Sequence, residues 1–223
     1  MQRVVEPEIL DGLAWDDPAA LGNRRDLRTI NALMGNFSWF GQELRMHLRP
    51  DEHIIELAAG DGALGRYLER HIIAPFGYRG GYAGLDRIPR PQRWPEDWEW
   101  LETDLANWCE SGGCPVVIGN FILHQLTDEE LRSLGEKLRC ARVLLFNETA
   151  RCRSALCLAY LGYVLGFNRV SRHDAPVSVR AGFQGRELAD LLGLDDETWS
   201  IHAWTTPMGS YRLKAIRKEE PSA

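Results

Sequence analysis

The sequence predicts an α/β protein, a three-layer α/β/α sandwich around a mostly parallel sheet of seven strands with an antiparallel last strand. Two observations support this fold class. From residue 53 onward, short apolar segments alternate with segments of helical spacing, which is typical of a parallel sheet covered by helices on both faces. The last two apolar segments are separated only by residues 205–209, too few for a crossover, so they should pair as an antiparallel hairpin.

Each element has its own local signal. The strands are expected at 53–57, 81–86, 98–105, 115–120, 141–148, 198–204 and 210–218. Helices are expected at 62–72, after 127, at 152–167 and at 185–193, and residues 171–183 are interpreted as a loop. The helix after 127 has a clear start signal, because Thr127 and Glu130 can form a capping box and Leu126 and Leu131 a hydrophobic staple.

The region before the first strand is expected to be separate. We interpret residues 1–48 as an N-terminal arm with cap helices, and residues 49–223 as the main domain. The first residues contain Pro7, Gly12 and Pro18 and are interpreted as a loosely held arm. Two helices are expected between residues 23 and 48, broken at Gly35 and Asn36.

Size and charge exclude several classes of protein. The chain has 223 residues and a net charge of −6, which fits one α/β domain. Binding a phosphate backbone needs a basic surface, so we expect no nucleic-acid partner. No apolar run approaches the roughly 20 residues of a membrane span. The first residues lack the apolar core of a signal peptide, so we expect a cytoplasmic protein, as a monomer or a homodimer.

The cysteines are five in number, and an odd count is most simply explained by a reducing compartment. The spacings of Cys109 with Cys114 and of Cys152 with Cys157 could suit zinc. On a helix, however, the side chains of Cys152 and Cys157 would diverge by about 140°. We therefore expect no metal site.

Residues 53–68, HIIELAAGDGALGRYL, predict a strand, a glycine turn and the start of a helix. Gly60 and Gly62 allow a sharp turn and a close approach of a ligand to the backbone. Ligands of open α/β sheets bind at the carboxyl ends of the strands. Asp86 ends the next strand, so its carboxylate is expected beside the loop, where it could hold both hydroxyls of a ribose.

Two classes of cofactor compete for this loop. Gly60, Gly62 and Gly65 match the dinucleotide fingerprint, and Asp86 follows at a suitable distance, which favours NAD. Glu56 favours a cationic ligand instead, because a negative charge at the strand end does not suit a pyrophosphate. S-adenosylmethionine carries a sulfonium and an ammonium group. A tight turn without a ligand is the third interpretation.

The loop sequence ELAAGDG resembles the first motif of class I S-adenosylmethionine-dependent methyltransferases, although Ala58 stands where the family usually has its first glycine. GYAGLD, ETDL and GNFILHQLTDEEL resemble the later motifs in order, and the closing hairpin resembles the antiparallel seventh strand of that fold. The resemblance covers about residues 50–217. It implies a Rossmann-like fold that binds S-adenosyl-L-methionine. The cofactor-binding residues that it implies are Glu56, Ala58, Gly60, Gly62, Asp86, Arg87, Asp104, Leu105 and Asn120.

Within this set, the resemblance implies that Asp86 binds the ribose and that Asp104 and Leu105 lie at the adenine. It also implies that Asn120 and His124 lie near the methionine end. A narrower resemblance rests on RRDLRTINALMG, LHQLTDEEL and RHDAPVSVRAGF. These segments are similar to a bacterial subgroup of small methyltransferases that often accompany type III polyketide synthases and flavin oxidoreductases. That similarity implies an aromatic or polyketide-like acceptor and a role in secondary metabolism.

Two histidines are candidate catalytic bases. Methyl transfer to a phenol oxygen gains from a base with a near-neutral pKa, which suits histidine. His124 follows the fourth predicted strand, close to the expected methyl group. His173 precedes Asp174, which could orient it. Each could instead be a solvated or capping histidine.

Three other features leave alternatives open. The apolar segment 152–167 is flanked by arginines and could be a buried helix, a lid over the acceptor, or a membrane-docking surface. Four tryptophans are expected to pack in the core or at the sheet edge, namely Trp94, Trp98, Trp100 and Trp108. Trp108 could also contact the adenine ring. Arg28 and Asn31 could face the cofactor, but a solvated helix face is slightly preferred.

The sequence therefore predicts a methyltransferase that acts on a small hydrophobic acceptor, with the oxygen of a phenol or hydroquinone as the expected methyl acceptor. A NAD(P)-dependent oxidoreductase is the first alternative. A non-catalytic methyltransferase-like binding module is the second.

Overall fold

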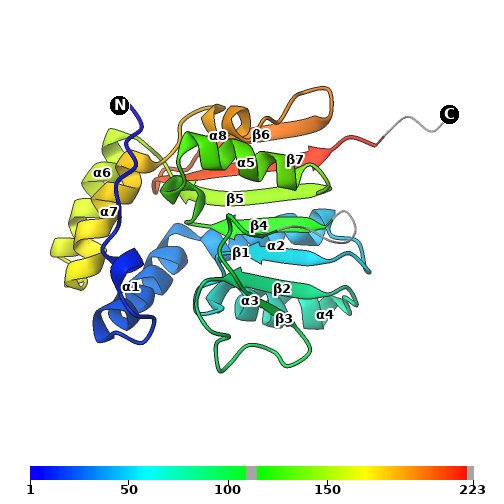
Figure 1. Cartoon of the computed structure of the whole chain (residues 1–223), viewed down its shortest axis with the longest axis horizontal. Coiled ribbons are helices and arrows are strands. Elements are labelled where there is room, and N and C mark those ends of the chain that lie inside the picture. Colours follow the sequence, from blue (N-terminus) through cyan, green and yellow to red (C-terminus); the bar gives the residue numbers. More distant parts are fainter. Residues whose placement is uncertain (109–114, 220–223) are drawn as a thin grey trace.

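A computed structural model of the chain describes residues 1–108 and 115–219. Its seven-stranded sheet has the order β3-β2-β1-β4-β5-β7-β6 (Figure 1). The strands are β1 (Ile54–Leu57), β2 (Tyr82–Asp86), β3 (Glu99–Glu102), β4 (Val116–Asn120), β5 (Val143–Thr149), β6 (Trp199–Thr205) and β7 (Ser210–Arg217). β7 is antiparallel to both β5 and β6, while the other neighbouring pairs are parallel. The predicted fold class, including the antiparallel last strand, is confirmed.

Helices cover both faces of the sheet and one end. They are α1 (Pro18–Met34), α2 (Asn36–His47), α3 (Ala63–Leu68), α4 (Ala74–Phe76), α5 (Asp128–Leu138), α6 (Arg153–Tyr160), α7 (Arg169–Ala181) and α8 (Glu187–Leu191). In Figure 1, α5 and α8 lie on one face of the sheet and α2, α3 and α4 on the other. The helices α1, α6 and α7 gather at the end where β5 runs into α6 (Figure 1).

The capping box at the start of α5 forms as predicted. The hydroxyl of Thr127 accepts from the amide of Glu130, and the Glu130 carboxylate accepts from the amide of Thr127. These two bonds satisfy amides that the first turn of a helix leaves without partners. The expected break at Gly35 is also present, because Gly35 has a left-handed backbone with φ of +64°.

The boundary expected after residue 48 divides elements that pack together. Trp39, Phe40 and Leu44 of α2 are buried in one cluster with Ile54 of β1 and Tyr82 of β2. The apolar side of α2 is therefore part of the core of the sandwich, and α2 does not form a separate cap.

The prediction of a loop at 171–183 is wrong, because these residues lie almost entirely in α7. Pro176 lies inside this helix, although a proline lacks an amide hydrogen and disfavours the interior of a helix. Tertiary contacts outweigh this local cost. Val170 and Val177 are buried, and the side chain of Asn168 caps the helix by accepting from the amide of Ser171 at 2.9 Å.

The prediction that the first residues form a loosely held arm is also wrong. Residues 3–10 run along α7 (Figure 1), and Arg3 anchors them through a hydrogen bond from Nε to the carbonyl of Ala181 at 2.9 Å. The amide of Val4 donates to the carbonyl of Arg180. The helix α1 then begins at Pro18, with Asp17 as its side-chain cap.

The tryptophans pack in the core and at the sheet edge, as expected. Trp98 stacks on Tyr82 with ring centroids 4.1 Å apart, and Trp94 meets Trp98 and Trp100 edge to face. Cys109 and Cys114 lie outside the described residues. Within residues 1–108 and 115–219, no group of three His, Cys, Asp or Glu side chains is arranged to hold a metal ion.

Candidate functional site

A cavity of about 700 Å³ lies where β1, β2 and β4 end. The loop after β1 forms one wall, and the N-terminal arm and α1 supply another. Eight of the nine cofactor-binding residues expected from the sequence line this cavity: Glu56, Ala58, Gly60, Asp86, Arg87, Asp104, Leu105 and Asn120. A position at the carboxyl ends of parallel strands is the usual ligand site of such a sheet.

The two expected loop glycines have different roles. Gly60 has φ of +58°, and a Cβ built there meets nothing within 4 Å, so a side chain would enter the open cavity. Gly62 does not belong to the lining. It has φ of +73°, and its Cβ would lie 2.8 Å from a ring carbon of Trp94. Gly62 therefore allows Trp94 to pack closely at the start of α3. Gly60 leaves the cavity free of a side chain at this position.

Asp86 is held by the backbone on both sides. Its Oδ2 accepts from the amide of Gly60 at 2.7 Å, and its Oδ1 accepts from the amide of Ile88 at 3.2 Å. A carboxylate offers about four acceptor positions, so each oxygen keeps capacity for a ligand hydroxyl. This arrangement suits the expected contact with the two hydroxyls of a ribose.

Glu56 is buried and accepts a hydrogen bond from the hydroxyl of Tyr82 at 2.6 Å. Burial raises the pKa of Glu56 to about 8, because the charged form loses its hydration. The sequence suggested a permanent negative charge at this position. In the free protein at neutral pH, the carboxyl is mostly protonated, and a nearby cation would favour its ionised form.

An amide network links two residues of the cavity lining, Asn31 and Asn120, to the core. Oδ1 of Asn31, in α1, accepts from Nδ2 of Asn120 at 3.1 Å and from Nδ2 of Asn36 at 2.9 Å. Asn147 in turn donates to Asn120 at 2.9 Å. Asn31 and Arg28 both line the cavity, so the preferred interpretation of a purely solvated helix face is wrong for these two residues.

His124 does not reach the cavity. The residue is buried, its Nδ1 lies 2.6 Å from Oε2 of Glu148, and its Nε2 lies 3.3 Å from Oε1 of Glu8. Burial by itself would lower the pKa of His124, but the charges and hydrogen bonds of Glu148 and Glu8 outweigh it and raise the pKa to about 10. A protonated histidine with both nitrogens engaged cannot accept a proton, which contradicts the expected role as a base.

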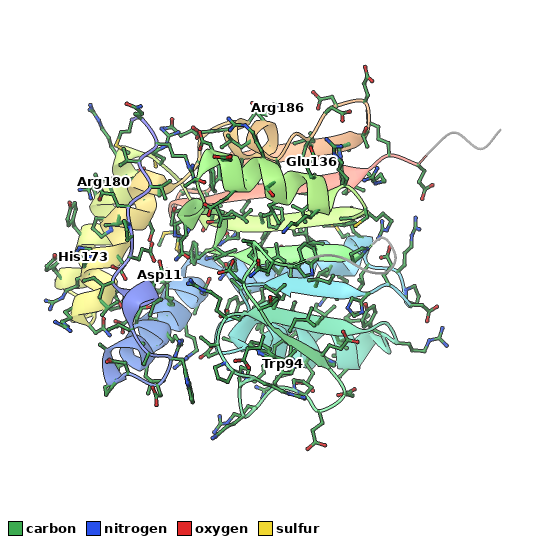
Figure 2. All side chains as sticks on the ribbon, viewed as in Figure 1. Asp11, Trp94, Glu136, His173, Arg180 and Arg186 are labelled. Carbon is green, nitrogen blue, oxygen red and sulfur yellow. The ribbon has the colours of Figure 1, made fainter. Side chains whose placement is uncertain are left out.

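His173 is also remote from the cavity lining. Its Nδ1 lies 2.8 Å from Oδ1 of Asp174, as the sequence suggested, but the ring is half exposed on the outer side of α7 (Figure 2). Trp108 is buried in the core beside Leu105 and is not part of the described lining. These positions do not support the base role of His173 or an adenine contact of Trp108.

The N-terminal arm supplies lining residues that the sequence did not suggest, namely Leu10, Asp11, Leu13 and Trp15. The pKa of Asp11 is raised, first by burial and then by the charge of Glu8. Arg87 lies 3.2 Å from its carboxylate. The arm and the loop after β2 are far apart in sequence, so only the fold brings these side chains together.

Comparison with solved structures identifies the fold. The plantazolicin methyltransferase BamL, solved with SAH and a triazolic desmethylPZN analog, matches with a TM-score of 0.72 and 8% identity over 94% of this chain and 93% of that chain. The plantazolicin methyltransferase BpumL, in complex with SAH, matches with a TM-score of 0.70 and 10% identity over 92% and 93%. The N-methyltransferase NodS from Bradyrhizobium japonicum WM9, in complex with S-adenosyl-L-homocysteine, matches with a TM-score of 0.50 and 14% identity over 92% and 90%.

The chain therefore has the fold of class I S-adenosylmethionine-dependent methyltransferases. No protein-family model matches the sequence, and no curated protein matches it. None of the helices in the described part of the chain is long and apolar enough to cross a membrane.

Proposed function

We propose that the protein is an S-adenosylmethionine-dependent methyltransferase. The observation that carries this proposal is the position of Asp86, which is tied to the loop at Gly60 and faces a large cavity at the strand ends. Neighbours that share the fold, with TM-scores of 0.70 and 0.72, were solved with SAH, which supports the proposal.

The residues of the cavity fit this cofactor. We assign Asp86 to the ribose hydroxyls, Asp104 and Leu105 to the adenine, and Asn120 and Glu56 to the methionine end. Gly60 leaves space for the cofactor to approach the backbone, since a Cβ would stand in the open cavity. When bound, S-adenosylmethionine supplies a methyl group on a sulfonium centre.

The oxidoreductase alternative is less well supported. Dinucleotide-binding sheets have the order 3-2-1-4-5-6 and are mostly parallel, whereas here β7 inserts antiparallel between β5 and β6. Acidic side chains also outnumber basic ones in the cavity lining, which disfavours a pyrophosphate. A non-catalytic module would be expected to have a closed pocket, and an open cavity of about 700 Å³ argues against it.

We further propose that the acceptor is small and hydrophobic, with a phenol or hydroquinone oxygen that receives the methyl group. Leu10, Leu13 and Trp15 of the arm and Leu27 of α1 give the cavity an apolar side. An aromatic or polyketide-type acceptor follows from the narrower sequence resemblance. Asp11 takes over the base role expected of the histidines, because it lines the cavity and its raised pKa favours proton uptake from a phenol.

Calorimetric titration with S-adenosylhomocysteine tests the cofactor, and NADH serves as the competing ligand. We expect binding of S-adenosylhomocysteine and none of NADH. Methyl transfer is then assayed with labelled cofactor and a panel of phenols, with aliphatic amines as the comparison. The absence of S-adenosylhomocysteine binding at millimolar concentration would overturn the proposed cofactor, and transfer only to amines would overturn the oxygen acceptor.

A further inference from the structure

Apolar side chains are exposed at the turn between α6 and α7. We call Tyr160, Leu161, Tyr163, Val164 and Leu165 the apolar tip. Val164 is 83% exposed and Leu165 60% exposed. In α6 itself only Ala155 is buried. The interpretation of 152–167 as a buried helix is therefore wrong. None of the described cavity-lining residues comes from this segment, so the interpretation as a lid over the cavity is not supported either.

Arginines surround the apolar tip. Residues 153–180 contain Arg153, Arg169, Arg172 and Arg180 but only one acidic residue, Asp174. Asp174 is buried, and its carboxylate accepts from the amides of Ile9 and Leu10. The accessible charge of this hairpin is therefore positive, although the whole chain has a net charge of −6.

The arginines contact the tyrosines of the apolar tip directly. The guanidinium of Arg172 lies 5.2 Å from the ring centroid of Tyr163. Nη2 of Arg180 donates to the hydroxyl of Tyr160 at 3.2 Å. Tyrosine and arginine each combine an apolar body with a polar end, so together they match the boundary between lipid headgroups and acyl chains.

Two partners would cover such a surface. A second copy of the chain would form a twofold interface, in which the same patch meets itself. That geometry would set the arginines of one copy against those of the other. An anionic lipid surface would instead pair with the arginines, while the aliphatic side chains enter the acyl boundary.

We propose that the α6–α7 hairpin docks the protein on the surface of anionic membranes. Val164 and Leu165 enter the interface, the tyrosines lie at the headgroup level, and the arginines bind lipid phosphates or carboxylates. Both helices lie on the outside of the molecule at one end of the sheet, and Arg180 and His173 mark the outer side of α7 (Figures 1 and 2). This surface is separate from the cofactor cavity, so the proposal does not depend on the proposed function.

Co-sedimentation with vesicles tests the proposal on the full chain. The vesicles are phosphatidylcholine alone, or phosphatidylcholine mixed with phosphatidylserine. We expect binding to the anionic vesicles that falls with added salt, and little binding to phosphatidylcholine. The paired substitution Val164→Ser with Leu165→Ser should lower binding at least about tenfold, because it removes the inserted apolar groups. Arg169→Glu should lower it by more than about fivefold, the contribution of one basic residue.

Two matched controls separate docking from general surface effects. Met46→Ser removes an apolar side chain that is 63% exposed on α2, and Arg70→Glu changes an exposed arginine outside the hairpin. Both should bind like the wild type. Equal binding to neutral vesicles, no binding to anionic vesicles, or full binding by the Val164 and Leu165 variant would each overturn the proposal. A wild-type dimer in velocity sedimentation that this variant converts to a monomer would overturn it in favour of self-association.

Discussion

The backbone amide of Gly60 donates a hydrogen bond to Oδ2 of Asp86, 2.7 Å away. This bond joins the loop after β1 to the end of β2, and the amide of Ile88 holds the other carboxylate oxygen. The carboxylate is thus oriented before a ligand arrives. A group held in its binding geometry loses less entropy on binding, so we expect removal of this carboxylate to lower the affinity for a ligand of the cavity.

Asp86→Ala should therefore weaken the binding of S-adenosylhomocysteine by about one to two orders of magnitude. This change corresponds to the loss of about 1–3 kcal/mol of binding free energy, which is typical of lost hydrogen bonds to a charged group. Isothermal calorimetry measures the change. Asp51→Ala is the matched control, because Asp51 is an exposed acid that precedes β1, at the other end of the sheet. Unchanged affinity in Asp86→Ala would contradict the ribose assignment.

Affinity for the cofactor should also depend on pH through Glu56. The pKa of this carboxyl is about 8 because the side chain is buried. Pairing with a ligand ammonium requires the ionised form, so binding should release a proton at neutral pH. Affinity should rise from pH 6 toward pH 8, by up to about tenfold per unit.

Glu56→Gln isolates this effect, because glutamine keeps a hydrogen-bond acceptor for Tyr82 but cannot ionise. The two proteins should bind similarly at pH 6 and diverge by pH 8. The ligand's own amino group titrates equally in both experiments and cancels in the comparison. The same pH dependence in both proteins would show that Glu56 does not bind the cofactor's cationic end.

The buried pair of His124 and Glu148 should make stability depend on pH. The pKa of His124 is raised to about 10 from 6.5. A raised pKa means that the stabilisation is fully present below about pH 6.5. It is then lost as the pH rises through 10, so the free energy of unfolding should fall across this window in urea titrations.

Nuclear magnetic resonance of the histidine rings assigns the effect to one residue. The ring of His124 should stay in its charged form at pH 8. His124→Gln should destabilise the protein at pH 7 by about 3–5 kcal/mol, because it leaves a buried carboxylate without its partner. His202→Gln, at an exposed position, should have little effect. A His124 ring that titrates near pH 6.5 would contradict the buried ion pair.

Substitutions of the loop glycines should separate binding from stability. Gly77→Ala is the reference, since Gly77 has φ of +62° and nothing within 4 Å of its Cβ, and a left-handed alanine costs about 1–2 kcal/mol. Gly60→Ala should cost the same stability but also reduce cofactor affinity. Gly62→Ala should lose more stability than either, because its Cβ meets the Trp94 ring at 2.8 Å. Equal stability losses at all three positions would argue against the close packing of Trp94.

Much of the fold could be predicted because its signals are local. The strands are short apolar runs between turns, and the start of α5 is encoded within residues 126–131. The errors occurred where distant contacts decide the outcome. Residues 169–181 are helical despite Pro176 because the segment packs against α1 and α6, and propensity is only a weak prior against such contacts.

The candidate site was predicted in part for the same reason. Gly60, Asp86 and Asp104 belong to strand ends, which a parallel sheet must bring to one edge. The base candidates were not predictable in this way. Proximity in sequence placed His124 near the cavity, but its ring points to Glu148 in the core. Asp11 reaches the cavity only because the arm is anchored along α7.

Local patterns in the sequence were enough to predict the order of the strands, the glycine loop and the acid that ends β2, because each depends on residues close together in the chain. The tertiary structure decided which side chains line the cavity, which histidine is buried, and which apolar segment stays exposed. These properties depend on contacts between residues more than a hundred positions apart, such as Glu8 with His124. Burial raises the pKa of Glu56, and the charges of Glu148 and Glu8 raise the pKa of His124, so no local pattern carries that information.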